Sequence, residues 1–362
     1  MTLRVIDRQS ARTTWQLEST LNGRTVHTDV EGAYLAGRAV TSGSTVALSG
    51  QMAEPGTVSI IPDATITSAS WNGRPLPHFT DAPVPGPAAV SAPTLHWVSK
   101  TGAPEAAQGY DDSTWKVASS TTERTPWQKP TLGGAALDSN LLGFYEGSVW
   151  YRAHFTADTT RTLKLNANGG QGAPKPNGVD PAFMQVWING TYAGAYRAVG
   201  NTTSIELPSS IKAGDPVVLS VVVHNLGQNL DWSDDGLSRQ SRGLNSASLP
   251  AKGAVTWRVR GALSTEQTGD TARTMYNNGD LYGERAGWYL PGMPDKDWTA
   301  ATTMTVDHPG IRWYRSTFNL SVPTGQDTTF QVVVKPSGNG KGPGGVGADH
   351  SQATIFVNGG NT

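Results

Sequence analysis

One polar loop in this chain contains residue types that could bind a metal ion. The loop reads HNLGQNLDWSDDGLSRQSRG over residues 224–243. Carboxylate and amide oxygens are the ligands that Ca²⁺ prefers, and the loop offers them at Asn225, Asp231, Asp234 and Asp235. Their spacing does not match the fixed ligand positions of a calcium-binding loop. Structural calcium is therefore one alternative for this loop.

The same loop could instead bind a carbohydrate. Trp232 could stack on the face of a pyranose ring, while Asp231 and Arg242 hydrogen-bond its hydroxyl groups. A third alternative needs no ligand, because a solvated loop could pair Arg242 with its own aspartates. The residues leave these three alternatives open.

Two glutamates outside this loop are candidates for contact with a sugar. Glu146 in FYEGSVW and Glu284 in YGERAGW each lie among aromatic residues and glycine. A retaining glycosidase needs two carboxyl groups about 5 Å apart, and nothing in the sequence pairs these two. The favoured alternative is that each caps a turn or pairs with a nearby arginine such as Arg152 or Arg285. We therefore predict no catalytic residue and keep both glutamates as carbohydrate-binding candidates.

Other common chemistries find no support in the sequence. The chain has no cysteine, which excludes disulfides and thiolate zinc sites, and it has no Gly-x-Ser-x-Gly motif. Gly340, Gly342 and Gly345 fit Gly-x-Gly-x-x-Gly, but a strand rather than a helix is expected after them, which predicts a surface loop. No cofactor is predicted apart from the calcium alternative.

Composition limits the partners. The net charge of −1 over 362 residues gives no electrostatic reason to expect nucleic acid. No run of about 18 apolar residues is present, so no membrane partner is predicted. The first residues, MTLRVIDRQS, lack the apolar core of a signal peptide.

Short apolar runs of period two, separated by Gly, Pro, Asn and Asp, predict an all-β protein. With 42 glycines and 23 prolines the chain is rich in turns. The strands expected from this pattern cover residues 45–50, 57–62, 68–73, 149–155, 162–167, 184–190, 217–225, 255–261, 312–318, 330–335 and 353–359.

Three blocks occur twice in the same order. In a first copy, YDDSTW precedes VWYRAHF and then VWING; in a second copy, PDKDW precedes RWYRSTF and then IFVNG. Each block predicts a structure: an acidic turn followed by a buried tryptophan, a strand with an arginine, and a hairpin that turns at Asn-Gly. The repeat predicts two related β-sandwiches.

The predicted organisation has three parts. A small β-rich domain covers residues 1–90 and ends in a Pro- and Ala-rich linker. A jelly-roll sandwich covers 91–265, and a second jelly roll covers 266–362. After its Asn-Gly turn the first copy continues with about four more strands, whereas the second copy stops. We therefore expect the second jelly roll to be incomplete and completed by material outside residues 1–362.

The blocks resemble the C-terminal, non-catalytic part of family 35 glycoside hydrolases, the β-galactosidases of fungal and actinobacterial type. GAYLAGRAVTSGSTVALSGQM (32–52) is similar to the β-rich domain that follows their barrel. LHWVSKTGAPEAAQGYDDSTWKVA (95–118) and GFYEGSVWYRAHF (143–155) resemble their first galactose-binding-like jelly roll. LYGERAGWYLPG (281–292) and GIRWYRSTFNL (310–320) resemble the start of the second.

The resemblance implies an accessory role. Members of the family hydrolyse β-galactosides with two glutamates on an N-terminal (β/α)₈ barrel, which would need about 250 residues absent here. The resemblance therefore implies a non-catalytic portion whose partners are that barrel or a missing C-terminal segment, with galactosides as a further partner, and it implies secretion. The alternative is an independent carbohydrate-binding or adhesion protein. The two differ in whether the chain alone binds glycans.

Overall fold

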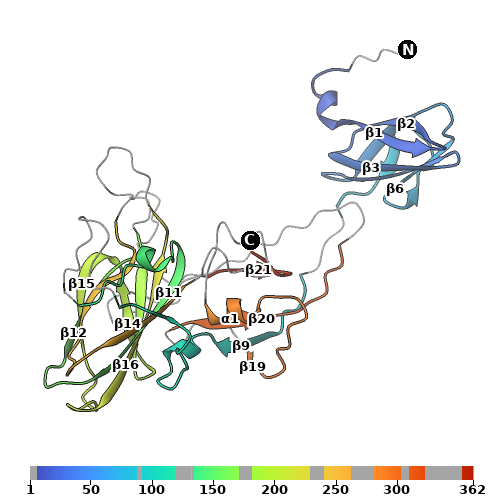
Figure 1. Ribbon diagram of the computed structural model, residues 1–362. Helices are drawn as coiled ribbons and strands as arrows, with labels where there is room; N and C mark the ends of the chain where they lie inside the picture. Colours follow the sequence, from blue (N-terminus) through green and yellow to red (C-terminus); the bar gives the residue numbers. More distant parts are fainter. Residues whose placement is uncertain are drawn as a thin grey trace. The chain divides into compact units, whose positions relative to one another are not determined.

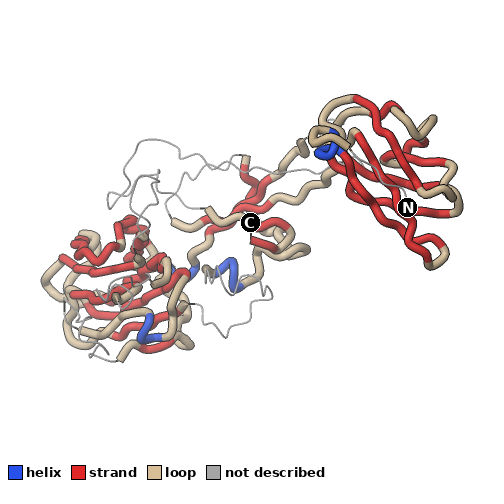
Figure 2. Tube along the Cα trace, turned by 90° about the horizontal axis from the view of Figure 1, so that it is seen from above, coloured by secondary structure: helices blue, strands red, loops and turns tan. Residues whose placement is uncertain are grey.

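The structure is a computed structural model, and it describes residues 6–87, 92–119, 132, 134–170, 182–228, 240–261, 281–302, 310–322 and 353–361. Almost all regular elements in these residues are β-strands (Figures 1 and 2). The helical elements are one short α-helix and three 3-10 turns: η1 (Ser10–Thr13), η2 (Pro104–Ala106), η3 (Asn140–Leu142) and α1 (Tyr282–Arg285). The prediction of an all-β fold is confirmed.

The chain divides into two compact units. The first unit comprises Met1–Leu95 and Thr317–Val333, and the second comprises His96–Ser316 and Val334–Thr362. The predicted boundaries near residues 90 and 265 remain a prediction.

The first unit contains two four-stranded sheets. One sheet has the order β1 (Thr14–Leu21), β2 (Arg24–Glu31), β5 (Gly56–Pro62) and β8 (Ala82–Val84). The other has the order β3 (Leu35–Ser42), β4 (Thr45–Gln51), β6 (Ser68–Trp71) and β7 (Arg74–Pro75). Alternate residues of both sheets form one buried core, which includes Val30, Leu48, Val58 and Trp71. This alternation of buried and exposed positions is what a sandwich requires.

The second unit contains both copies of the repeat, and the first copy covers residues 103–261. Its larger sheet has the order β10 (Lys116–Val117), β18 (Thr256–Arg260), β11 (Gly147–Thr156), β16 (Pro216–Asn225), β13 (Phe183–Ile188) and β14 (Thr191–Arg197). Its smaller sheet has the order β15 (Val199–Glu206), β12 (Thr162–Asn168) and β17 (Gly243–Ser248). Strand β11 sends Val149, Tyr151, Ala153 and Phe155 into the core shared with β12.

Asn-Gly turns close hairpins in both copies of the repeat. A type I′ turn needs positive φ at both central residues, which asparagine and glycine tolerate best. At Asn189 and Gly190 the φ angles are 48° and 81°, and at Asn358 and Gly359 they are 50° and 87°. The predicted turn near the last residue is confirmed. Its partner strand was expected outside residues 1–362, and this expectation was wrong, because β21 (Phe356–Val357) pairs with β22 (Gly360–Asn361).

The second copy, residues 281–361, uses a strand from outside its own sequence block. Its three-stranded sheet has the order β19 (Thr299–Ala301), β9 (Trp97–Thr101) and β20 (Arg312–Arg315). Figure 1 shows β9, in teal, beside β19 and β20, in orange. We expected the strands that complete the second copy to come from outside residues 1–362. One position of its sheet is instead filled by residues that precede the first copy.

Candidate functional site

The outer face of the six-stranded sheet is covered by the segment that contains η2 and the acidic turn. Trp150, Trp187 and Val222 lie on this face, because the neighbouring residues of their strands point into the main core. Ala106 and Trp115 pack on them from the covering segment. We call residues 103–115 the cover.

Arg152 fixes the cover to the sheet. It lies on β11, is fully buried, and donates from Nε to Asp112 Oδ2 at 2.6 Å. Its Nη1 donates to the carbonyl oxygens of Glu105 and of Ala107, the latter at 3.0 Å. Its Nη2 lies 3.4 Å from the carbonyl oxygens of Gln108 and Tyr110. One guanidinium therefore fixes four backbone carbonyls and a carboxylate of the cover.

Three basic side chains lie next to the carboxylate of Asp112. Besides Arg152, His154 Nε2 lies 2.6 Å from Asp112 Oδ2, and Arg258 Nε lies 3.5 Å from Oδ1. The backbone carbonyl of Asp112 accepts from the N–H of Trp115 at 2.9 Å, which forms the acidic turn. The His154 side chain is 38% exposed, so this end of the cluster reaches solvent.

The second copy repeats this arrangement. Arg315 on β20 donates from Nε to Asp295 Oδ2 at 3.2 Å. Its Nη1 donates to the carbonyls of Trp288 and Leu290, and the Asp295 carbonyl accepts from the N–H of Trp298 at 2.9 Å. The repeated Asp and Arg thus have the same structural role in both copies.

A second ion pair joins the cover to the second copy. Glu105 is fully buried, and its Oε1 accepts from Arg285 Nη2. Burial raises the pKa of Glu105 above the ordinary glutamate value, and the positive charge of Arg285 opposes this shift. The carboxylate is enclosed by protein and is not placed to reach a substrate.

The tryptophans of the two acidic turns are buried, as predicted. Trp115 is 5% exposed and Trp298 is 7% exposed. Trp115 packs on the outer face of its sheet, and Trp298 packs edge-on against Trp288 with ring centroids 5.1 Å apart. Neither offers a ring face to a sugar.

Arg242, a predicted carbohydrate ligand, is fully buried. Its Nε donates to the carbonyl of Gly227 at 2.8 Å, and its backbone N–H donates to Asp138 Oδ1 at 3.1 Å. Burial lowers the pKa of Arg242 and raises that of Asp138. In this arrangement the guanidinium faces protein rather than solvent.

Asn225, a predicted calcium ligand, is 2% exposed. Its Oδ1 accepts from the N–H of Gly227 at 3.0 Å, and its Nδ2 donates to Ser139 Oγ at 3.4 Å. The other predicted ligands of this loop lie outside the described residues: Asp231, Trp232, Asp234 and Asp235. The described part of the chain contains no group of three or more His, Cys, Asp or Glu side chains placed to hold a metal ion. The calcium and sugar alternatives for this loop remain predictions.

Glu146 is half-buried, and Glu284, on α1, is 5% exposed. Of the two arginines expected near them, Arg152 pairs with Asp112 and Arg285 pairs with Glu105. A role of either glutamate in carbohydrate binding remains a prediction.

Asp112, Glu105 and Asp295 were not among the predicted site residues. A signal was available for two of them, because both acidic turns have aspartate three residues before tryptophan. Both strands also have arginine two residues after tryptophan. A charge pair conserved between two copies of a repeat indicates contact.

Curated relatives of this chain include fungal proteins. Beta-galactosidase A of Penicillium sp is 32% identical over 251 residues, which is 66% of this chain and 23% of that protein. Probable beta-galactosidase B of Penicillium rubens is 28% identical over 388 residues, covering 98% of this chain and 35% of that protein. The chain thus spans about a quarter to a third of the length of these relatives.

A solved family 2 glycosyl hydrolase from Bacteroides cellulosilyticus is 16% identical over 46% of this chain and 20% of its own chain, with a TM-score of 0.25. That score is too low to support a conclusion about shared architecture.

The model of the β-galactosidase second all-beta domain matches residues 110–229 and 282–361, which together are more than half of the chain. Each matched stretch lies within one copy, and the two stretches include both acidic turns, both arginine strands and both Asn-Gly hairpins. The chain therefore belongs to the family of the β-galactosidase second all-beta domain.

Proposed function

We propose that this chain is a non-catalytic accessory portion of a β-galactosidase-like glycoside hydrolase, and that it supports a catalytic barrel outside these residues. The observation that supports this proposal is the match of both copies to the β-galactosidase second all-beta domain. The named relatives, which are three to four times longer than the matched region, are β-galactosidases.

The arrangement of charged side chains agrees with a supporting role. Asp112 and Glu105 are buried carboxylates held by arginines. A catalytic carboxyl group must contact its substrate, and these two face protein. Their ion pairs with arginines hold the cover in place.

Turnover of a chromogenic β-galactoside by the purified chain tests the proposal. We expect no hydrolysis above the buffer blank. Hydrolysis that is abolished by Glu146→Gln or by Glu284→Gln would overturn it, and Glu206→Gln, an exposed carboxylate on β15, is the matched control.

Binding of galactosides by the isolated chain separates the proposal from an independent binding module. An accessory portion is expected to give no signal on a glycan array. Specific binding to immobilised galactosides, with no partner present, would favour a lectin-like protein instead.

We also propose that the parent protein is exported, as the resemblance to family 35 β-galactosidases implies and in agreement with the names of the fungal relatives. No helix in the described part of the chain is long and apolar enough to cross a membrane. Detection of the full-length protein in culture medium rather than in cells tests this proposal.

A further inference from the structure

In the sheet of each copy, one strand lies between the strand that follows the acidic-turn tryptophan and the strand that contains the arginine. In the first copy β18 lies between β10 and β11, and in the second copy β9 lies between β19 and β20. All four pairings are antiparallel. Strand β10 follows the buried Trp115 and β19 follows the buried Trp298, so the outer strands correspond in the repeat.

The register is also the same on one side of β18 and of β9. Arg152 on β11 lies opposite Arg258 on β18. Its counterpart Arg315 on β20 lies opposite Val98 on β9. Val98 therefore has the position of Arg258.

The ladders on the other side of β18 and β9, with β10 and β19, independently give Val98 the position of Arg258. Val117, the second residue after Trp115, lies opposite Arg258. Ala300, the second residue after Trp298, lies opposite Val98. A slip of one residue in either ladder would turn the side chains to the other face of the sheet. Strand β9 could pair with β19 and β20 in other registers, so the equal register in both ladders supports the correspondence between β9 and β18.

We propose that β9 is the counterpart in the second copy of β18 in the first, so that the first copy is inserted into the second between β9 and α1. In this arrangement residues 97–112 form a strap, with one end in the sheet of the second copy and the other end in the cover of the first.

The two ends of the strap are held by contacts only a few residues apart in the sequence. The N–H of Gly102 donates to the carbonyl of Ile311 at 2.8 Å. A Cβ at Gly102 would lie 2.7 Å from Trp313 Cδ1 and 2.8 Å from Ile311 Cγ2, so the backbone lies directly against the second copy. Two residues later η2 begins, and its carbonyls bind Arg152. Displacement of either end is thus transmitted to the other.

The second copy also holds the strap from the side. Arg285 on α1 pairs with Glu105 of the strap. Ile311, next to β20, packs against the cluster of Trp150 and Trp187 on the first copy. We therefore infer that the two copies open together and form one cooperative unit.

Disulfide trapping tests the placement of β9, and the absence of cysteine from the chain removes any background. Val98→Cys with Ala300→Cys places two cysteines directly opposite each other on paired strands, where a disulfide can form. The matched control is Val98→Cys with Thr299→Cys, because adjacent residues of a strand point to opposite faces. We expect a disulfide in the first variant of the full chain and not in the second. Equal yields, or none in a folded first variant, would overturn the insertion.

Hydrogen exchange of the full chain tests the coupling. Asp112→Asn removes the ionic anchor of the strap on the first copy. We expect amides of 97–101 and 312–315, in the second copy's sheet, to exchange about ten-fold faster or more.

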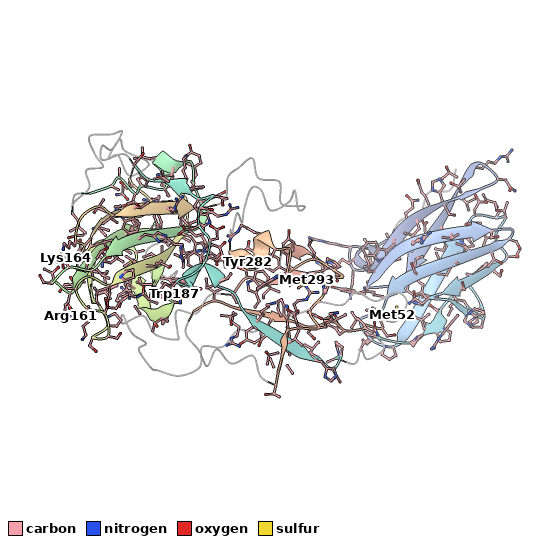
Figure 3. The ribbon with its side chains drawn as sticks, turned by 60° about the horizontal axis from the view of Figure 1, so that its bottom comes forward. Met52, Arg161, Lys164, Trp187, Tyr282 and Met293 are labelled. Carbon is pink, nitrogen blue, oxygen red and sulfur yellow. The ribbon has the colours of Figure 1, made fainter. Side chains whose placement is uncertain are left out.

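The control variant is Arg161→Ala, which removes hydrogen bonds to the carbonyls of Leu207 and Ile211 within the first copy. In Figure 3 Arg161 lies well away from Trp187, which packs beneath the cover. This variant should leave exchange at 97–101 unchanged. If Asp112→Asn accelerates exchange only in the first copy, the strap does not couple the two copies.

Discussion

Arg152 is a charged side chain without contact to solvent, and it is stable there because its guanidinium is surrounded by acceptors. Removing one partner of a buried ion pair leaves the other charge buried without compensation, which costs about 3–5 kcal/mol. We expect Arg152→Ala to lower the free energy of unfolding by about that amount, measured by urea denaturation. Arg197→Ala, at an exposed position of β14, is the control and should change it by less than about 0.5 kcal/mol. Equal effects of the two variants would contradict the assigned role.

Glu105 makes a pH-dependent contribution to stability. Burial raises its folded-state pKa above the ordinary value of 4.5, against the opposing charge of Arg285. The folded protein therefore binds this proton more tightly than the unfolded chain does. Its contribution is fully present below pH 4.5 and is lost as the pH rises through the raised folded pKa.

We expect Glu105→Gln to remove this decrease in the free energy of unfolding, because glutamine does not titrate. Denaturation curves at several pH values measure the difference. Glu206→Gln, at an exposed carboxylate, should leave the pH dependence as it is. If Glu105→Gln also leaves it unchanged, the buried carboxylate is not its source.

At the scale of elements, the Asn-Gly turns set the register of the hairpins they close. Gly190 has φ of +81°, which an L side chain rarely adopts. We expect Gly190→Ala to destabilise the protein by about 1–2 kcal/mol. Gly109→Ala is the matched control, because Gly109 does not have positive φ and a Cβ there would meet nothing within 4 Å. Thermal unfolding of both variants measures the difference, and equal melting temperatures would contradict the turn's role.

Strands β16 and β21 of the second unit differ in how much of their length is paired. Strand β16 is paired over its length with β11 and along part of its length with β13. The described pairing of β21 consists of two residues opposite β22. We expect amides of 353–358 to exchange much faster than those of Val221, Val222 and Val223, measured by mass spectrometry. Equal protection of the two segments in a proven monomer would show that β21 is held by further contacts.

Local sequence patterns predicted many of the strands, since alternation and Asn-Gly turns act over a few residues. The strands expected at 149–155, 217–225 and 255–261 correspond to β11, β16 and β18. The pattern did not identify β1, β2 and β9. No residue of β1 is buried, and one of the three buried residues of β2 is the polar Thr28, so the alternation of apolar residues is weak.

The pairing of β9 could not be predicted, because its partners lie about two hundred residues later in the chain. No local signal specifies which distant strand it meets. The candidate site had the same limit: the sequence contains Asp112 and Arg152 at repeated positions, but only the fold brings the cover over β11. The aspartates of residues 231–235 lie outside the described residues, so the predicted ligand loop remains a prediction.

At the scale of the whole molecule, the two units have separate hydrophobic cores. Leu48 belongs to the core of the first unit, and Leu165 belongs to the core of the first copy in the second unit. Both leucines are at most 2% exposed. The two cores share no residue, so each leucine contributes directly to the stability of its own unit.

Truncating each leucine in turn tests whether the units unfold separately. Leu→Ala in a core costs about 2–5 kcal/mol. We expect Leu48→Ala to lower the melting temperature of one calorimetric transition and Leu165→Ala to lower that of another, with hydrogen exchange assigning each transition to its unit. The second transition should include the strap and both copies, because β9 links them. If either variant shifts both transitions equally, the two units unfold together, and the supporting role would belong to the chain as a whole rather than to the coupled copies.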